Sequence, residues 1–314
     1  MIGTPGRSDS LRGRQPASAS EKVTSMQTTA ATNVACPIDG LPIDASGTQR
    51  RCAAGHSFDI ARAGYCNLLV VQHKASRDPG DSKDMVAARR RFLGADHFQP
   101  IADHVFNAVR ECVAAAAHGA FNVVDAGCGE GYHLDRLACL ATASPEPGTL
   151  ELVGIDVSKS AVKAAARRKA PVTWLVANNR APPFLAGSVD LVLCLFGFPV
   201  WEGFKKTQKP GGHVLLVDPA ADHLFELREI IYPTVRRSRP PPLADAGTAG
   251  YRLQREDKLR FSVTLTEAEM IQDLVAMTPH AHRMPQAGRK ALAELRNLSV
   301  TIDVAFRLLA LERA

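Results

Sequence analysis

The sequence lacks any apolar run long enough to cross a bilayer. The best candidate, residues 191–201, falls short of the roughly 18 residues that a membrane-spanning helix needs, and Gly197 and Pro199 interrupt it. The N-terminus also lacks the apolar core of a secretory signal peptide. We therefore expect a cytoplasmic protein with no membrane partner.

The chain has few cysteines and a small net charge. The seven cysteines are an odd number and are scattered along the chain, which favours reduced thiols or metal ligands over a disulfide framework. Thirty-eight basic and 32 acidic residues leave a net charge of only +6. This mild excess permits a nucleic-acid partner without requiring one, because clustering of charge matters more than the total.

A P-loop is also missing, although the stretch FNVVDAGCGEGYH (residues 121–133) is rich in glycine. No Gly-Lys-Ser/Thr follows it. A dinucleotide-binding fingerprint would place its third glycine where Tyr132 stands. The loop is instead G-x-G-x-G, preceded by Asp125 at the end of an apolar run. It predicts either a nucleotide-like ligand close to the backbone or a tight turn in some other α/β protein.

From about residue 97 the pattern alternates between helices and continuous apolar strands. Such strands with helical crossovers predict a parallel, doubly wound α/β sheet. We expect helices at 98–117, 131–140, 160–169 and 266–276, and strands at 123–127, 151–156, 172–177, 190–196, 213–219, 251–264 and 299–309.

Composition divides the chain into four parts. Residues 1–33 have no apolar period and predict a disordered tail, within which Met26 is an alternative start of translation. Residues 34–70 predict a small β-rich module that needs a staple. Residues 71–96 predict a basic linker and helix, and residues 97–314 the α/β domain.

Polar side chains follow the second and third strands of the α/β domain. Asp156 ends the second strand, where a carboxylate can accept both ribose hydroxyls of a nucleoside; the alternative is a helix N-cap. Asn178 and Asn179 follow the third, where an amide can read adenine. With RAPPFLAGSVDLVLCLF and KPGGHVLLV, this series resembles class I S-adenosylmethionine-dependent methyltransferases. The candidate cofactor-binding residues are Asp125, Gly127, Gly129, Glu130, Gly131, Tyr132, Asp156, Asn178 and Asn179.

A narrower resemblance begins at residue 64. GYCNLLVVQHKASRDPGDSKDMVAARRRFL, then DAGCGEGY and GIDVSKSAVKAAA, is similar to the bacterial large-subunit (23S) ribosomal RNA guanine-N1 methyltransferases. The resemblance covers about residues 34–310. It implies a zinc-ribbon-like, zinc-binding RNA module on a Rossmann-like methyltransferase domain. It also implies transfer of a methyl group to a guanine N1 in a hairpin loop of that RNA.

The metal site departs from the family pattern C-x2-C…C-x3-H. The matching positions are Cys36, Asp39, Cys52 and His56, so a carboxylate replaces one thiolate. Zinc accepts such an oxygen ligand. The alternative is that Cys36 and Cys52 pack as small apolar groups. Cys66 is expected in the core and not as a ligand.

The resemblance also suggests which residues meet RNA. Phosphates would meet basic residues of the linker and helix, although a solvated helix face is the alternative for each arginine. The base would stack on aromatic rings near the fourth strand, where we expect Phe196 in the core, and Phe198 and Trp201 either at the base or in the core. The candidates are Lys74, Arg77, Arg89, Arg90, Arg91, Phe198 and Trp201, with Arg236, Arg237 and Arg239 as further cations.

Several points stay open at this stage. The proton acceptor for guanine N1 is not identified. The loop Phe196-Gly197-Phe198-Pro199 differs from the family pattern, so another RNA nucleotide or a small molecule is an alternative acceptor. A non-catalytic RNA-binding module is a third reading. The oligomeric state is open, with a homodimer as one option.

Overall fold

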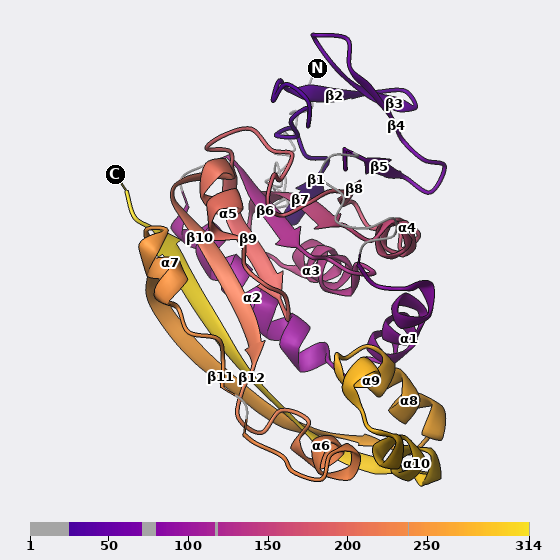
Figure 1. Cartoon of the computed structure of the whole chain (residues 1–314). Coiled ribbons are helices and arrows are strands. Elements are labelled where there is room, and N and C mark those ends of the chain that lie inside the picture. The colour runs from indigo at the N-terminus through magenta and orange to yellow at the C-terminus, as the bar shows by residue number, and fades with distance from the viewer. Residues whose placement is uncertain (1–24, 71–79, 117–118, 238, 314) are drawn as a thin grey trace, which may run out of the picture.

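The computed structural model describes residues 25–70, 80–116, 119–237 and 239–313. One large sheet forms the centre of the molecule (Figure 1). Its strands run in the order β11-β12-β10-β9-β6-β7-β8-β5, and β1 pairs with β7 outside this path. Their bounds are β1 Met26–Thr29, β5 Tyr65–Asn67, β6 Ala120–Ala126, β7 Gly148–Asp156, β8 Thr173–Val176, β9 Val189–Leu195, β10 Gln208–Pro219, β11 Tyr251–Leu265 and β12 Leu298–Leu311.

Parallel pairing runs from β5 to β10, as the continuous apolar strands predict. The chain builds outward from β6 through β7 to β8 and then crosses to β9 on the other side of β6. In open α/β sheets, ligands bind at the carboxyl ends of the strands where the order reverses in this way. The far edge differs, because β12 is antiparallel to both β10 and β11.

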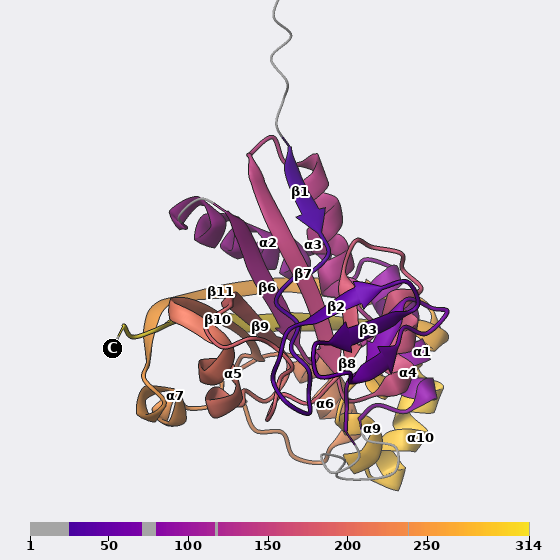
Figure 2. The ribbon, with the colours of Figure 1, turned by 90° about the horizontal axis from the view of Figure 1, so that it is seen from above.

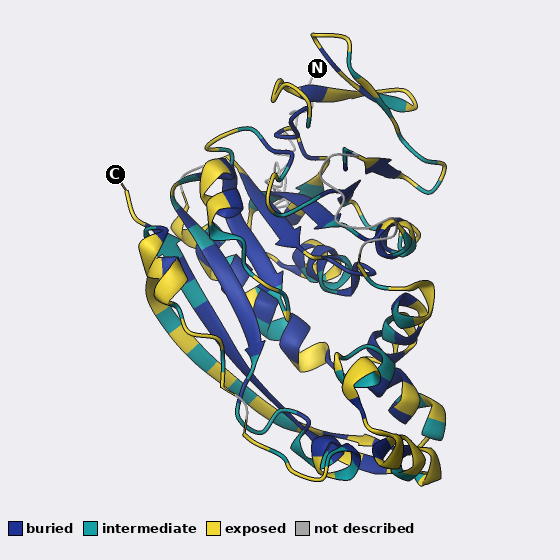
Figure 3. Cartoon of the chain, in the orientation of Figure 1, coloured by how far each residue is buried: buried dark blue, intermediate teal, exposed yellow. Residues whose placement is uncertain are grey.

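Alternate side chains of the central strands enter two cores, one on each face of the sheet. Val123 packs with the helices that include α2 (Gln99–Ala115), α3 (Tyr132–Ala143) and α4 (Lys159–Ala166). Val124, the next residue, packs on the opposite face with α5 (Trp201–Thr207), α7 (Ala244–Thr248) and the N-terminal module. The central strands are accordingly buried along most of their length, whereas β11 alternates with exposed positions (Figure 3).

The N-terminal boundary needs a correction. Residues 26–33 were expected within a disordered tail, but Met26–Thr29 form β1, which lies parallel to β7 (Figure 2). Met26 is buried, and the Thr32 N–H and hydroxyl donate to the Glu151 carboxylate at 3.0 Å each. Short polar segments lack apolar periodicity even when they add to a sheet edge through backbone hydrogen bonds. Residues 1–24 lie outside the described residues.

The N-terminal module is a small antiparallel sheet of β2 (Ile43–Ser46), β3 (Gln49–Cys52) and β4 (Ser57–Asp59). It does not stand apart from the large sheet. The Ala35 N–H donates to the Pro183 carbonyl at 2.8 Å, and β5, which follows β4, pairs with β8. The module therefore continues into the central sheet.

Helix α1 (Lys83–Gly94) lies between α4 and the C-terminal helices. Its buried residues include Val86, Phe92 and Leu93. It contacts α4 and α8 (Ala268–Ala276). Two further helices, α9 (His280–Arg283) and α10 (Gln286–Glu294), lie beyond α8, and α6 (Phe225–Ile231) lies close to α10 (Figure 1). None of the helices in the described ranges has the length and apolarity to span a membrane.

Candidate functional site

Three glycines form the loop between β6 and α3, and each has a positive φ. The angles are 102° at Gly127, 55° at Gly129 and 86° at Gly131, which other residues rarely adopt. A Cβ on Gly131 would lie 2.7 Å from the Trp174 ring, so this glycine also permits close packing. At Gly127, in contrast, no atom lies within 4 Å of the position that a Cβ would take. The loop is thus tightly packed at Gly131 and leaves free space at Gly127.

Asp156 at the end of β7 faces this loop. Its Oδ2 accepts a hydrogen bond from the Gly129 N–H at 3.0 Å, and its Oδ1 accepts one from the Ser158 N–H at 2.8 Å. The N-cap of α4 is Ser158, whose hydroxyl accepts from the Ala161 N–H. The capping alternative for Asp156 is therefore wrong. The carboxylate oxygens retain lone pairs for further donors.

Asp125, near the end of β6, is an electrostatic neighbour of Asp156. It is almost fully buried, and its Oδ1 has no hydrogen-bond partner within the described part of the chain. Burial, and to a smaller extent the neighbouring Asp156, raise the pKa of Asp125 to about 7. A buried oxygen without a partner is costly, so this one indicates a cationic or hydrogen-bonding ligand group.

Two other predicted cofactor residues have partners within the protein. Glu130 is buried and forms an ion pair with Arg168, whose Nε also donates to the Glu130 carbonyl at 2.9 Å. The buried Tyr132 hydroxyl donates to Asp96 Oδ1 at 3.3 Å. Both side chains fix the loop to its surroundings.

Asn178 and Asn179 follow β8 at the same edge of the sheet. Asn178 Oδ1 accepts from the Arg180 N–H at 2.8 Å, and the Asn178 carbonyl accepts from the Ala181 N–H at 3.2 Å. The two residues thus form a tight turn, and both side chains are half-buried.

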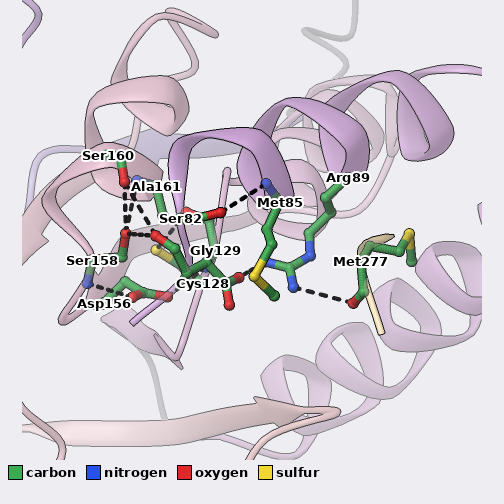
Figure 4. A network of polar contacts seen from close by, with 11 residues as sticks. Ser82, Met85, Arg89, Cys128, Gly129, Asp156, Ser158, Ser160, Ala161 and Met277 are labelled. Carbon is green, nitrogen blue, oxygen red and sulfur yellow. Dashed lines mark hydrogen bonds and ion pairs between the residues drawn. The ribbon is translucent and has the colours of Figure 1, made fainter. Parts of the chain in front are cut away.

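A network of polar contacts joins α1 to the glycine loop and to the loop that follows β7 (Figure 4). The Asp81 carbonyl accepts from the hydroxyls of Ser158 and Ser160 at 2.9 and 3.3 Å. The Asp81 carboxylate pairs with Arg89, whose Nη1 lies 3.2 Å from where a Gly129 Cβ would be. Sequence reasoning missed this link. Asp81 and Ser158 are 77 residues apart, and only the fold brings them together.

The structure brings all four predicted metal ligands together. The ligand atoms of Cys36, Asp39, Cys52 and His56 lie within 4.8 Å of one another. His56 Nδ1 is 2.8 Å from Asp39 Oδ2 and 3.5 Å from each sulfur. The Leu41 N–H is the main cause that lowers the pKa of Asp39 to about 2. Both thiols are buried, so packing and ligation are compatible here, and Cys66 lies in the core outside the cluster.

The arginines predicted to meet RNA differ in their surroundings. Arg91 binds Asp273 of α8 through two hydrogen bonds of 2.8 and 2.6 Å, and Arg89 faces the glycine loop. Arg90, between them, is exposed. Of the further cations, Arg237 pairs with Asp222. Lys74 and Arg77 lie outside the described residues.

The aromatic residues that follow β9 also differ in how far they are buried. Trp201 is half-buried and packs on Tyr251 at a ring distance of 5.1 Å, on the face opposite α2. Phe198 is 89% exposed. The expectation that Phe196 lies in the core is wrong, because its side chain is 38% exposed. Its φ of 54° turns the chain out of the sheet directly after β9, a departure that residue type alone does not signal.

The chain has clear relatives. A family model for the N-terminal zinc ribbon of RlmA matches residues 34–77, and a methyltransferase domain model matches residues 123–212. The 23S rRNA (guanine(748)-N(1))-methyltransferase of Streptomyces fradiae is 32% identical over 275 residues, covering 86% of this chain and 94% of that one. YxjB of Bacillus subtilis, whose name proposes a guanine-N1 activity on 23S rRNA, is 32% identical over 277 residues with the same coverage. The chain belongs to this methyltransferase family.

Membership in the 23S rRNA (guanine-N1)-methyltransferase family agrees with the fold. The zinc ribbon precedes a doubly wound methyltransferase sheet, as the sequence predicts. Among solved structures, the YcgJ protein of Bacillus subtilis is 16% identical with a TM-score of 0.39, covering 68% of this chain and 99% of that one. The enzyme class is thus established.

Proposed function

We propose that this chain transfers a methyl group from S-adenosylmethionine to N1 of a guanine in a hairpin loop of 23S ribosomal RNA, in the cytoplasm. The observation that carries the proposal is the glycine loop of positive φ, with the Asp156 carboxylate turned onto the Gly129 N–H at 3.0 Å. The relatives named for this reaction support it, since they match 86% of the chain. A homodimer stays a prediction, which sedimentation of the purified chain would test.

The residues at the loop fit the cofactor. Gly127 leaves open space beside the backbone, and Asp156 offers oxygens to ribose hydroxyls. The unpartnered Oδ1 of Asp125 suits the cofactor's ammonium group. Asn178 and Asn179 lie at the carboxyl edge of the parallel strands, where they could meet adenine. When bound, the cofactor supplies an electrophilic methyl group on sulfonium. The protein contributes positioning and the exclusion of water.

The acceptor base would stack on Phe196. This residue follows β9, the strand next to β6, and its ring centre lies 6.3 Å from that of Phe98 and 5.9 Å from that of His223. The three rings pack together at the carboxyl edge of the sheet, where Phe98 is buried and Phe196 is exposed. The exposed Phe198, two residues on, extends this group of rings toward solvent.

His223 is suited to donate a hydrogen bond to this base. Its Nδ1 accepts from the Asp303 N–H at 3.3 Å, which leaves the proton of the neutral ring on Nε2. Burial lowers the pKa of His223 to about 4, so the ring is neutral at pH 7. Nε2–H would then donate to guanine O6, where negative charge grows as N1 loses its proton. Adenine, with an amino group at this position, could not accept that bond.

Zinc held by Cys36, Asp39, Cys52 and His56 would stabilise the N-terminal module. With Arg90, this module is our candidate for the RNA-binding surface. Two thiolates, one carboxylate and one imidazole form a four-ligand set of the kind that structural zinc sites use. The side-chain geometry supports zinc through the short distances among the four ligand atoms.

Primer extension on methylated RNA tests the proposal. An N1-methylguanine cannot form a Watson–Crick pair, so reverse transcriptase should stop there after 23S RNA is incubated with enzyme and cofactor. We expect Phe196→Ala to lower kcat/KM by about 5- to 150-fold, because stacking contributes roughly 1–3 kcal/mol per base. Phe261→Ala, which is half-buried in β11 and outside the N-terminal module, serves as the matched aromatic control. Transfer of labelled methyl to small molecules but not to RNA would contradict the proposal.

A further inference from the structure

Arg89 occupies an unusual place for a cation on a surface helix. Its guanidinium lies against Gly129, with Nη1 3.2 Å from where a Cβ would be, and only 22% of its side chain is exposed. Asp81 holds Nη1, and Nη2 makes one long contact of 3.5 Å with the Met277 carbonyl. Figure 4 shows the guanidinium between the glycine loop and Met277. This side chain faces the cofactor loop and not the solvent.

The charges around the loop leave one requirement unmet. Asp125 and Asp156 are the carboxylates that face it, and they suit cationic and hydroxyl groups. S-adenosylmethionine also carries an α-carboxylate, which needs a cation or several N–H donors. A site built only from acids would repel that end of the cofactor.

Neighbouring cations are already engaged. Arg168 binds Glu130 and also Asp135, at 3.0 Å, and is 12% exposed. Arg91 is held by Asp273 through two hydrogen bonds. His133 is no counter-ion, because burial, helped by nearby Arg168 and Arg89, lowers its pKa to about 4.

Arg89 retains the donors that this role needs. A guanidinium has five N–H groups, of which one contacts Asp81 and one makes the long contact with Met277 in the described structure. An arginine that meets an RNA backbone would instead need solvent access on its outer side, which the exposed Arg90 has.

We propose that Arg89 is the cofactor-binding residue that recognises the α-carboxylate of S-adenosylmethionine, with Asp81 orienting its guanidinium beside Gly129. This inference rests on the proposed cofactor and replaces an RNA-binding role for Arg89. Asp81 also fixes the loop of Asp156 through Ser158 Oγ at 2.9 Å. Asp81 therefore links Arg89, through its carboxylate, to the loop that follows β7, through its backbone carbonyl.

Calorimetric titration with two ligands tests this role. Decarboxylated S-adenosylmethionine differs from S-adenosylmethionine only in lacking the carboxylate. The wild-type protein should bind S-adenosylmethionine about 10- to 100-fold more tightly, since hydrogen bonds between charged groups contribute on that scale. Arg89→Gln should lose this preference, chiefly through weaker binding of S-adenosylmethionine, and should bind the decarboxylated ligand as the wild type does.

Arg90→Gln is the matched control, because it removes the adjacent exposed cation from the same helix. It should keep the wild-type preference, and thermal unfolding of each variant checks that it is folded. An unchanged preference in Arg89→Gln, or an equal loss of both ligands, would overturn the role of Arg89. If the wild-type protein bound neither ligand, the proposed function itself would fail, which is a distinguishable result.

Discussion

At Gly131, a missing side chain lets the glycine loop pack onto the sheet. An alanine there would adopt a φ of 86° and place its Cβ 2.7 Å from Trp174 and 2.8 Å from Ala165 Cβ. We expect Gly131→Ala to lower the free energy of unfolding by about 2–5 kcal/mol, from backbone strain and overpacking together. Urea unfolding measures this change.

Gly187 provides the control for strain alone. Its φ is 64°, but nothing lies within 4 Å of the position that a Cβ would take. Gly187→Ala should therefore cost only about 1–2 kcal/mol. Equal losses in the two variants would show that the contact with Trp174 contributes nothing.

Asp125 should make the free energy of unfolding fall as pH rises, whereas most acids in folded proteins have the opposite effect. Its pKa is about 7 when folded, against about 3.9 in an unfolded chain. The folded state thus holds the proton more tightly, so this stabilisation is complete below about pH 4 and is lost as pH rises through 7. Relative to the wild type, Asp125→Asn should gain about 2 kcal/mol in unfolding free energy between pH 5 and 7.

Asp84→Asn, which changes an exposed acid on α1, is the matched control. Chemical unfolding of the three proteins across this pH range separates the effects. A constant difference between Asp125→Asn and the wild type would mean that Asp125 is ionised throughout, against the burial seen here.

At the scale of elements, β1 is held to the sheet by more than its backbone. Met26 is buried, and Glu151, itself 5% exposed, accepts hydrogen bonds from Thr32. A chain that begins at residue 34 should be less stable than one that begins at residue 25 by about 3 kcal/mol or more, because it loses the burial of Met26 and leaves Glu151 without these donors. Thermal unfolding compares the two chains, and equal midpoints would show that β1 is dispensable.

The helices α1 to α4 and the parallel strands β6 to β10 could be predicted, because their apolar periodicity reflects burial on one or both faces, whereas the short helix α5 was not predicted. The antiparallel direction of β12 could not, since it depends on how the chain returns after α10. Within the site, the glycines and Asp156 form a local motif. The proposed roles of Phe196 and Arg89 needed the structure, because they depend on a backbone turn and on contacts with distant residues.

Across the whole molecule, loss of metal should separate the two binding functions. We expect Asp39→Ala to lose bound zinc and to bind 23S RNA about tenfold more weakly, while its affinity for S-adenosylmethionine stays within about twofold. Elemental analysis, RNA titration and calorimetry give the three readouts. Asp39→Cys, which supplies a thiolate, should retain zinc at chelator concentrations that strip the wild type.

Glu256→Ala, which alters an exposed acid of β11 outside the N-terminal module, should change none of these quantities. Full RNA affinity in a zinc-free Asp39→Ala protein would exclude the metal from RNA binding.

Because β5 pairs with β8 residue by residue, from Tyr65 opposite Trp174 to Asn67 opposite Val176, the zinc module has no freedom to slide along the methyltransferase sheet. A shift of two residues in that pairing would displace the module by about 6.6 Å, roughly the spacing between successive nucleotides in an extended strand. If the N-terminal module binds the RNA, as proposed, and the methyltransferase domain modifies it, the alignment of β5 with β8 would determine which nucleotide along the RNA is methylated.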